Sequence, residues 1–192
     1  PGITNVNGGF IAALTIGQSG TNGTVSGLTQ NNSDVTLSGD MTVAGPISIY
    51  GKSINVSANL TTSTASAILL KATQDVALGA GTSTTVRKSL TTNGGPITLW
   101  SNADVTGLGQ ITLANYTELS SKAGAITLAG SASATEASPT GYATAGSGAN
   151  GVEIGSSNVA TDSAKLTTTS GSITVRGKLV SSSTTGTGIR LV

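Results

Sequence analysis

Short segments in which apolar and polar residues alternate recur along the chain. The clearest lie at 47–49, 97–99, 126–128 and 173–175, where Ile, Leu or Val flanks a Ser or Thr. Alternation with a period of two is typical of a strand that buries one face, and β-branched residues suit that pleated surface. No apolar period of 3.6 residues persists, so the pattern predicts an all-β chain with few or no helices.

These segments belong to a longer repeat that begins with Gly. It reads Gly-Pro-Ile-Ser-Ile-Tyr-Gly at 45–51, Gly-Pro-Ile-Thr-Leu-Trp-Ser at 95–101, Gly-Ala-Ile-Thr-Leu-Ala-Gly at 124–130 and Gly-Ser-Ile-Thr-Val-Arg-Gly at 171–177. Degenerate copies lie at 67–71 and 151–155. The first apolar residues are Ile47, Ile68, Ile97, Ile126, Val152 and Ile173, at spacings of 21, 29, 29, 26 and 21 residues. Such a period predicts the coils of a parallel β-solenoid, with the length variation in turns and loops.

Further short strands are expected between the repeats. Candidates lie at 34–37, 41–43, 53–56, 75–78, 110–113 and 165–167, separated by Gly, Ser, Asn and Asp. We therefore expect two or three strands per coil and a single solenoid over 34–192. Residues 1–33 are expected to form an N-terminal coil or cap, with a polar loop or looser coil at 17–33. The irregular stretch at 131–150 is predicted to be an extruded loop.

Composition narrows the function classes. The chain of 192 residues has no Cys and no His, 9% charged residues and a formal net charge of +1. The missing Cys and His exclude a Ser-His-Asp triad, a thiol nucleophile, a disulfide framework and a zinc site of the usual kind. A charge of +1 gives no electrostatic footprint for nucleic acid, and no apolar stretch is long enough to cross a membrane as a helix. No cofactor is predicted.

The repeats at 95–100, 124–130 and 171–177, and the stretch at 34–43, resemble the coils of filamentous haemagglutinin-like proteins. Those are large secreted bacterial adhesins built on a right-handed β-helix. The resemblance covers residues 34–192 and implies a right-handed solenoid, secretion or a place on the bacterial cell surface, and an adhesive role. The Asn-Pro-Asn motifs of that family's secretion domain are missing. The segment therefore belongs to the repetitive shaft or to a different exported family.

The acidic residues have two possible roles, in a catalytic or ligand-binding face or in turns. They are Asp34, Asp40, Asp75, Asp104, Glu118, Glu136, Glu153 and Asp162. A solenoid glycosidase or lyase needs carboxylates clustered on one face of adjacent coils. Asp75 and Asp104 are 29 residues apart, about one coil, so they could stack in one column. The two interpretations are a calcium or sugar-ring site and turn residues that cap backbone groups. No catalytic or metal-binding residue is assigned.

One outward column carries the candidate ligand or partner surface. Tyr50 and Trp100 follow the apolar pair of their repeats, and Lys71 and Arg176 occupy the same position in theirs. Exposed aromatic rings beside cations stack on sugar rings or bind partner proteins. The alternative is that these side chains cover a neighbouring loop or the edge of the solenoid.

A second outward column contains Ser48, Thr98, Thr127 and Thr174, the kind of ladder that some ice-binding solenoids use. Leu69 and Glu153 are expected to interrupt it.

Together these patterns predict a non-enzymatic extracellular structural or adhesive segment of a bacterial surface or fibre-forming protein. Its partners would be a glycan or protein on a host or neighbouring cell. The C-terminal edge is expected to continue into more solenoid or to pair end to end with another copy. A carbohydrate-active β-helix enzyme, and a specialised glycan- or ice-binding solenoid, remain the alternatives.

Overall fold

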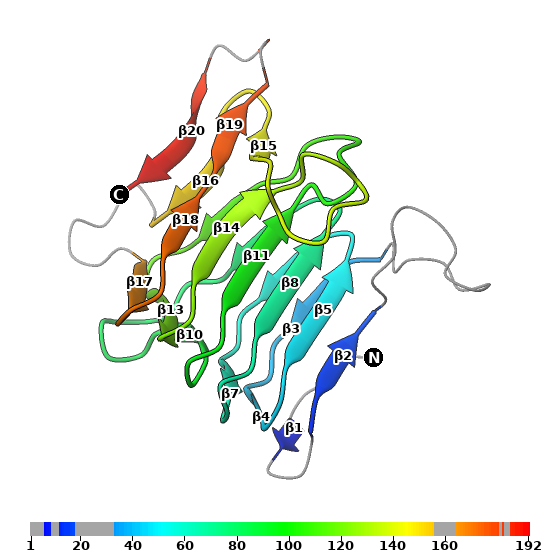
Figure 1. The fold of residues 1–192 in the computed structure, drawn as a ribbon. Helices are drawn as coiled ribbons and strands as arrows, with labels where there is room; N and C mark the ends of the chain where they lie inside the picture. Colours follow the sequence, from blue (N-terminus) through cyan, green and yellow to red (C-terminus); the bar gives the residue numbers. More distant parts are fainter. Residues whose placement is uncertain (1–5, 9–11, 18–32, 156–163, 181, 183–184) are drawn as a thin grey trace.

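The described part of the chain is a stack of parallel strands. The computed structural model describes residues 6–8, 12–17, 33–155, 164–180, 182 and 185–192 (Figure 1). Within the described residues all twenty elements are strands, and every pairing between two strands is parallel. The all-β parallel solenoid predicted from the alternation is confirmed. Most of the polar stretch at 17–33 lies outside the described residues.

Three six-stranded sheets make up the faces of the solenoid. The first sheet contains β1 (Val6–Gly8), β4 (Met41–Val43), β7 (Leu60–Thr62), β10 (Lys88–Thr91), β13 (Thr117–Lys122) and β17 (Lys165–Thr168). The second contains β2 (Leu14–Ile16), β5 (Ile47–Gly51), β8 (Ile68–Ala72), β11 (Ile97–Ser101), β14 (Ile126–Gly130) and β18 (Ile173–Val175). The third contains β3 (Val35–Leu37), β6 (Ile54–Val56), β9 (Val76–Leu78), β12 (Ile111–Leu113), β16 (Ala149–Ile154) and β20 (Gly186–Leu191). A short pair is formed by β15 (Ala143–Ala145) and β19 (Gly177–Leu179).

The chain visits the three sheets in turn, so each circuit is one coil. In Figure 1 the front strands β5, β8, β11 and β14 run toward the upper right, while successive coils advance toward the upper left. The coil is therefore right-handed, as expected for parallel crossovers. The first coil contributes β1, β2 and β3, each the terminal strand of its sheet, and β1 and β2 lie at the opposite end of the stack from β20 (Figure 1).

Identical or similar apolar residues stack in the core. On the second sheet Ile47, Ile68, Ile97, Ile126 and Ile173 pair in succession along one column. The first four of these are fully buried, as are Ile49, Leu70, Leu99 and Leu128 in the next column. Each such side chain contributes about 1.5–3 kcal/mol by leaving water. Because every coil repeats this burial against its neighbours, the core is continuous along the stack.

The glycine that begins each clear copy of the repeat is needed because there is no room for a side chain. A Cβ on Gly124 would lie 2.1 Å from the carbonyl oxygen of Gly95, and a Cβ on Gly171 would lie 2.1 Å from that of Gly124. Just before this bend, Thr92 and Ser121 are buried and donate hydrogen bonds to the carbonyl oxygens of Gly95 and Gly124. Hydroxyl and glycine together fix the bend between the first and second sheets.

Val152 does not lie in the column predicted for it. It pairs with Ile111 on the third sheet, while Ile126 pairs with Ile173, which lies 47 residues later. That coil is longer than the predicted 21–29 residues because it carries the segment 131–142 and the extra strand β15. The alternation in 151–155 is the same on every face of a solenoid, so the pattern does not reveal which sheet receives the strand.

Candidate functional site

The predicted outward column exists. Tyr50 pairs with Lys71, and Lys71 pairs with Trp100, across β5, β8 and β11. Ala129 follows in β14, and the backbone N–H of Arg176 donates to the carbonyl oxygen of Leu128 in the next coil. The spacing in the sequence therefore predicted the alignment of these residues correctly.

The exposed position predicted for Trp100 is wrong. Its side chain is only 3% exposed, and its Nε1–H donates to Ser131 Oγ at 2.7 Å. Ser131 in turn donates to the carbonyl oxygen of Ala103 at 3.1 Å. Lys71 Nζ lies 3.8 Å from the centroid of the Trp100 ring, a cation–π contact. Trp100 thus anchors the chain that covers it, which is the alternative that the sequence left open.

Residues 131–142, the covering loop, are held by hydrogen bonds of their own. Glu136 accepts the N–H groups of Ala132 and Thr140 at 2.9 and 3.3 Å. Arg176 Nη1 donates to the carbonyl oxygen of Thr140 at 2.6 Å, and Gly130 forms a bridge with Gly141. Most of the predicted loop is therefore ordered against the solenoid. The predicted range of 131–150 also contains β15 and the start of β16.

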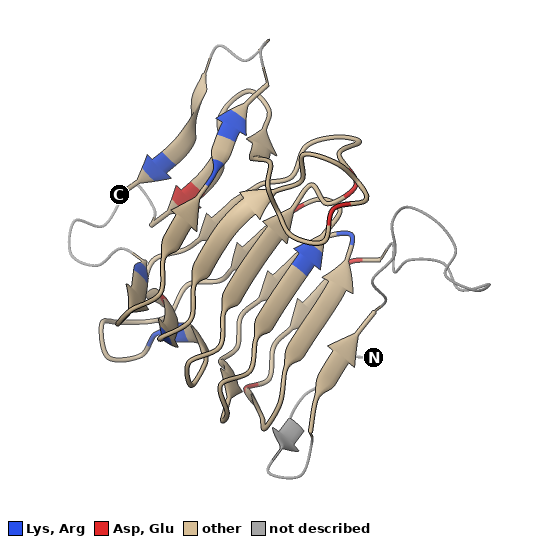
Figure 2. Ribbon diagram, in the orientation of Figure 1, with Lys and Arg blue, Asp and Glu red and all other residues tan. Residues whose placement is uncertain are grey.

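The pKa values of two charged groups near Trp100, Lys71 and Glu136, are shifted by their surroundings. Burial lowers the pKa of Lys71, and the nearby Glu136 carboxylate opposes that change. Burial would raise the pKa of Glu136, but hydrogen bonds from Thr140 and Ala132 outweigh it and hold that pKa below its ordinary value. Figure 2 shows how sparse the charges are on the second sheet, with acidic residues in the loops beside it.

A groove of about 440 Å³ lies beside the covering loop. Its lining includes Asn102 and Val105 from the turn after β11, Thr140 and Tyr142 from the covering loop, and Lys178 from β19. The Tyr142 side chain is 49% exposed, and Lys178 Nζ lies 5.7 Å from the centroid of its ring. Sequence reasoning assigned no role to Tyr142, because an aromatic residue in an irregular stretch has no periodic signal.

One residue that lines this groove carries an unsatisfied polar atom. Asn102 is 6% exposed, and its Oδ1 is buried without a hydrogen-bond partner among the described residues. Its φ of 48° and the φ of 54° at Val105 are left-handed, and for the β-branched Val105 this is a strained conformation.

The outer face of the first sheet carries a second groove, of about 520 Å³. It is polar, with Ser89, Thr91 and Ser120 from the strands and Thr84 and Arg87 from the preceding turn among its lining residues. An ion pair of 3.4 Å between Lys165 and Glu118 also lies there. This groove has no aromatic side chain among its lining residues, so it offers hydroxyl groups but no stacking surface.

The hydroxyl ladder on the second sheet follows the predicted register. Ser48, Leu69, Thr98, Thr127 and Thr174 pair in succession. The interruption at Leu69 is confirmed. The interruption predicted at Glu153 is wrong, because Glu153 pairs with Thr112 on the third sheet.

The described aspartates bind main-chain groups. Asp34 accepts the N–H of Ser53, and Asp40 accepts both the N–H and the side-chain amide of Asn59. Asp75 accepts the N–H of Gln110 in the next coil. The column considered for Asp75 and Asp104 does not form, and the alternative that they cap backbone groups at turns is confirmed. Gln110 occupies the position next to Asp75, and Asp104 caps its own turn at Thr106.

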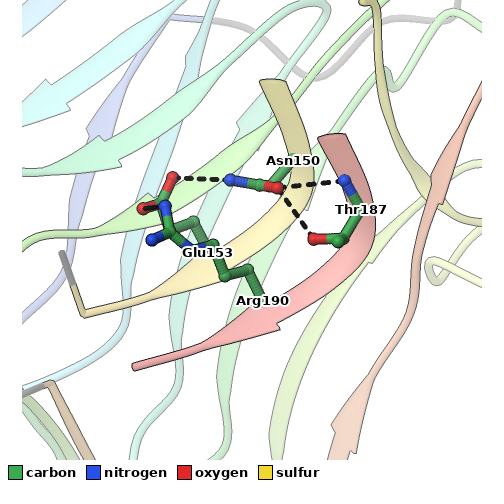
Figure 3. Close-up of polar contacts among 4 residues, drawn as sticks. All are labelled: Asn150, Glu153, Thr187 and Arg190. Carbon is green, nitrogen blue, oxygen red and sulfur yellow. Dashed lines mark hydrogen bonds and ion pairs between the residues drawn. The ribbon is translucent and has the colours of Figure 1, made fainter. Parts of the chain in front are cut away.

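The described glutamates are also engaged, and Glu153 holds the last described coil in place. It accepts from Asn150 Nδ2 at 3.0 Å and pairs with Arg190 Nη1 at 3.1 Å (Figure 3). Asn150 Oδ1 accepts both the N–H and the hydroxyl of Thr187. This network joins β16 to β20. Asp162 lies outside the described residues.

Within the described ranges, no cluster of three metal-ligating side chains occurs. The same ranges contain no helix long and apolar enough to span a membrane. No family model matches the chain, and searches of curated proteins and of solved structures also find no match.

Proposed function

We propose that this chain is a non-enzymatic extracellular segment with a structural and adhesive role, part of a bacterial surface or fibre-forming protein. The observation that carries the proposal is the unbroken register of the second sheet, which stacks β2 to β18 along one axis. A solenoid of this kind is a rod whose sides present loops and side-chain columns. The filamentous haemagglutinin-like style of its repeats supports a secreted or cell-surface location.

The environment of the acidic residues favours this role over carbohydrate hydrolysis. Asp34, Asp40 and Asp75 each accept a backbone N–H from a neighbouring coil. A general acid and its partner must instead face one substrate from adjacent positions. These carboxylates are committed to holding turns, so the polar surface is better suited to binding than to acid–base chemistry.

Adhesion would use the sides of the rod, and assembly would use its ends. The partner on the sides is a glycan or protein of a host or neighbouring cell. At the C-terminal end, Ile173, Ile189 and Leu191 are 46%, 41% and 72% exposed. These residues continue the columns of the core, so another coil or a second copy stacked on them would bury apolar surface and pair their strand edges.

Bead adhesion tests the proposed role directly. Beads coated with the purified chain are expected to attach to epithelial or bacterial cell layers more than beads coated with albumin. Saturating soluble chain should abolish the excess. Attachment equal to that of albumin beads on every cell layer would contradict an adhesive role.

A further inference from the structure

We propose that the groove between the turn after β11 and the covering loop is a saccharide-binding site, with Tyr142 as its stacking platform. The inference rests on the proposed adhesive function and names the ligand class and the site. It moves the site away from the column of Tyr50 and Trp100 to residues that the sequence did not single out.

The aromatic wall is the first argument. Tyr142 is 49% exposed in a chain with only 3% aromatic residues. Tyr142 lines a groove of about 440 Å³, a volume within the usual range for small-ligand sites. A pyranose ring has an apolar face of C–H groups and a rim of hydroxyls. An exposed phenol ring matches the apolar face and keeps its own hydroxyl at the wet edge.

The polar lining is the second argument. Thr140 and Thr144 line the groove, and Lys178 adds an ammonium group near the Tyr142 ring. The two hydroxyls already donate, to Glu136 and to the carbonyl oxygen of Tyr142, so their oxygens remain as acceptors. No carboxylate belongs to the described residues that line it. The threonine oxygens can accept from sugar hydroxyls, and the Lys178 ammonium group can donate to sugar hydroxyls or to the carboxylate of an acidic sugar.

The unsatisfied Asn102 is the third argument. A buried amide oxygen without a donor costs about 1–3 kcal/mol, so its retention calls for an explanation. Asn102 lines the groove, and a rotation of its side chain would offer Oδ1 to a ligand hydroxyl. Two left-handed residues, Asn102 and Val105, lie in the turn that supplies this side of the groove, and strain of the kind found at Val105 is concentrated at functional sites.

The groove is also organised before any ligand arrives. Trp100, Ser131 and Ala103 form a hydrogen-bonded chain that ties the covering loop to the turn after β11. Arg176 fixes Thr140 from the next coil. Both walls are thereby held at a set distance, which lowers the entropy lost on binding.

An array of immobilised neutral and acidic oligosaccharides, probed with the labelled chain, tests the site. Wild type is expected to bind at least one glycan. Tyr142→Ala should weaken that binding about tenfold, and Tyr142→Phe should retain it because the ring remains. Tyr50→Ala, an aromatic loss outside the groove, is the matched control and should bind like wild type. Lys178→Gln distinguishes the ligands, since it should weaken acidic glycans more than neutral ones.

Asn102→Gly is the second variant, because glycine keeps the left-handed backbone and removes the amide. It should also weaken binding, with an unchanged melting temperature showing that the fold is intact. The proposal is overturned if no glycan binds, or if Tyr142→Ala binds as well as Tyr50→Ala. Glycan binding and bead adhesion that both survive Tyr142→Ala would reject this site and keep the adhesive function. Glycan binding without bead adhesion would reject the adhesive function and keep the site.

Discussion

At the bend between the first and second sheets, the main chain of one coil lies against that of the next. The carbonyl oxygen of Gly95 occupies the space in which a side chain at position 124 would begin. The repeat therefore uses Gly for close approach of two backbones. The equivalent position in the coil of β8 is Ser66, so the glycine is not present in every coil.

Replacing Gly124 tests this steric account. Gly124→Ala is expected to destabilise the chain by about 2–3 kcal/mol, because backbone atoms must shift to accept the methyl group. For a chain of this size, that lowers the melting temperature by about 5–10 °C in calorimetry or circular dichroism. Gly107→Ala is the matched control, since a Cβ there meets nothing within 4 Å. Equal melting temperatures for the two variants would refute the steric role.

Asp40 gives the fold a component of acid sensitivity. Hydrogen bonds from the backbone N–H and the side-chain amide of Asn59 hold the pKa of Asp40 below its ordinary value of 3.8. The folded state therefore binds this proton less readily than the unfolded state. The stability that Asp40 contributes is present above pH 3.8 and is lost as the pH falls through the lowered pKa.

Comparison with Asp40→Asn isolates that contribution from the other carboxylates. At pH 7 the wild type should melt at a higher temperature than Asp40→Asn. The difference should shrink as the pH falls below 3.8 toward strong acid. Thermal melts over this pH series provide the measurement. A difference that stays constant with pH would mean that the charge on Asp40 does not stabilise the fold.

At the scale of strands, the sequence predicts what is periodic. The strands expected at 41–43, 75–78 and 110–113 are β4, β9 and β12 within a residue of their observed bounds. The column from Tyr50 to Trp100 is also predicted, because coils in register place equal repeat positions side by side. The alternation of apolar and polar residues predicts the strands, and the recurring Gly predicts which positions align between coils.

The positions of segments without a repeating pattern cannot be predicted in this way. The burial of Trp100 depends on where residues 131–142 fold back, and that path has no repeating pattern. The sequence assigns Val152 to the wrong sheet for the same reason. A long insertion changes the number of residues per coil, so the spacing in the sequence no longer shows which sheet a strand joins. Asn102 lies in the turn after β11, and Tyr142 lies in the covering loop. The two residues line one groove only because both segments lie on the same side of the solenoid.

The covering loop should depend on the Trp100 side chain. Trp100→Phe keeps an aromatic ring but removes the Nε1–H that donates to Ser131, a buried hydrogen bond worth about 1–1.5 kcal/mol. Backbone amides in 131–142 are then expected to exchange with deuterium about tenfold faster in mass spectrometry. Tyr50→Phe, in the same column, should leave their exchange unchanged. Equal exchange in Trp100→Phe and wild type would show that the hydrogen bond does not hold the loop.

At the scale of the molecule, each inner coil is stabilised by its two neighbours, whereas the first and last described coils each pair with one neighbour among the described residues. The columns that run through Ile126 and Ile154 reach Ile173 and Leu191, whose exposed fractions rise to 46% and 72%. The network of Asn150, Glu153, Thr187 and Arg190 keeps β20 in register (Figure 3). The edge is therefore an ordered template for another strand, and a head-to-tail contact of this kind does not close on itself.

End-to-end stacking is expected to be sensitive to charge at this edge. Leu191→Lys should abolish concentration-dependent rods in electron microscopy and sedimentation, because a lysine in the stacked column would be buried without a partner. Its melting temperature should stay close to that of the wild type at low concentration, since Leu191 is already 72% exposed. Val86→Lys places the same charge on another exposed apolar residue, 54% accessible and away from the edge, and should still form rods. A wild-type chain that sediments as a monomer at every concentration, or rods that persist in Leu191→Lys, would exclude stacking through this coil.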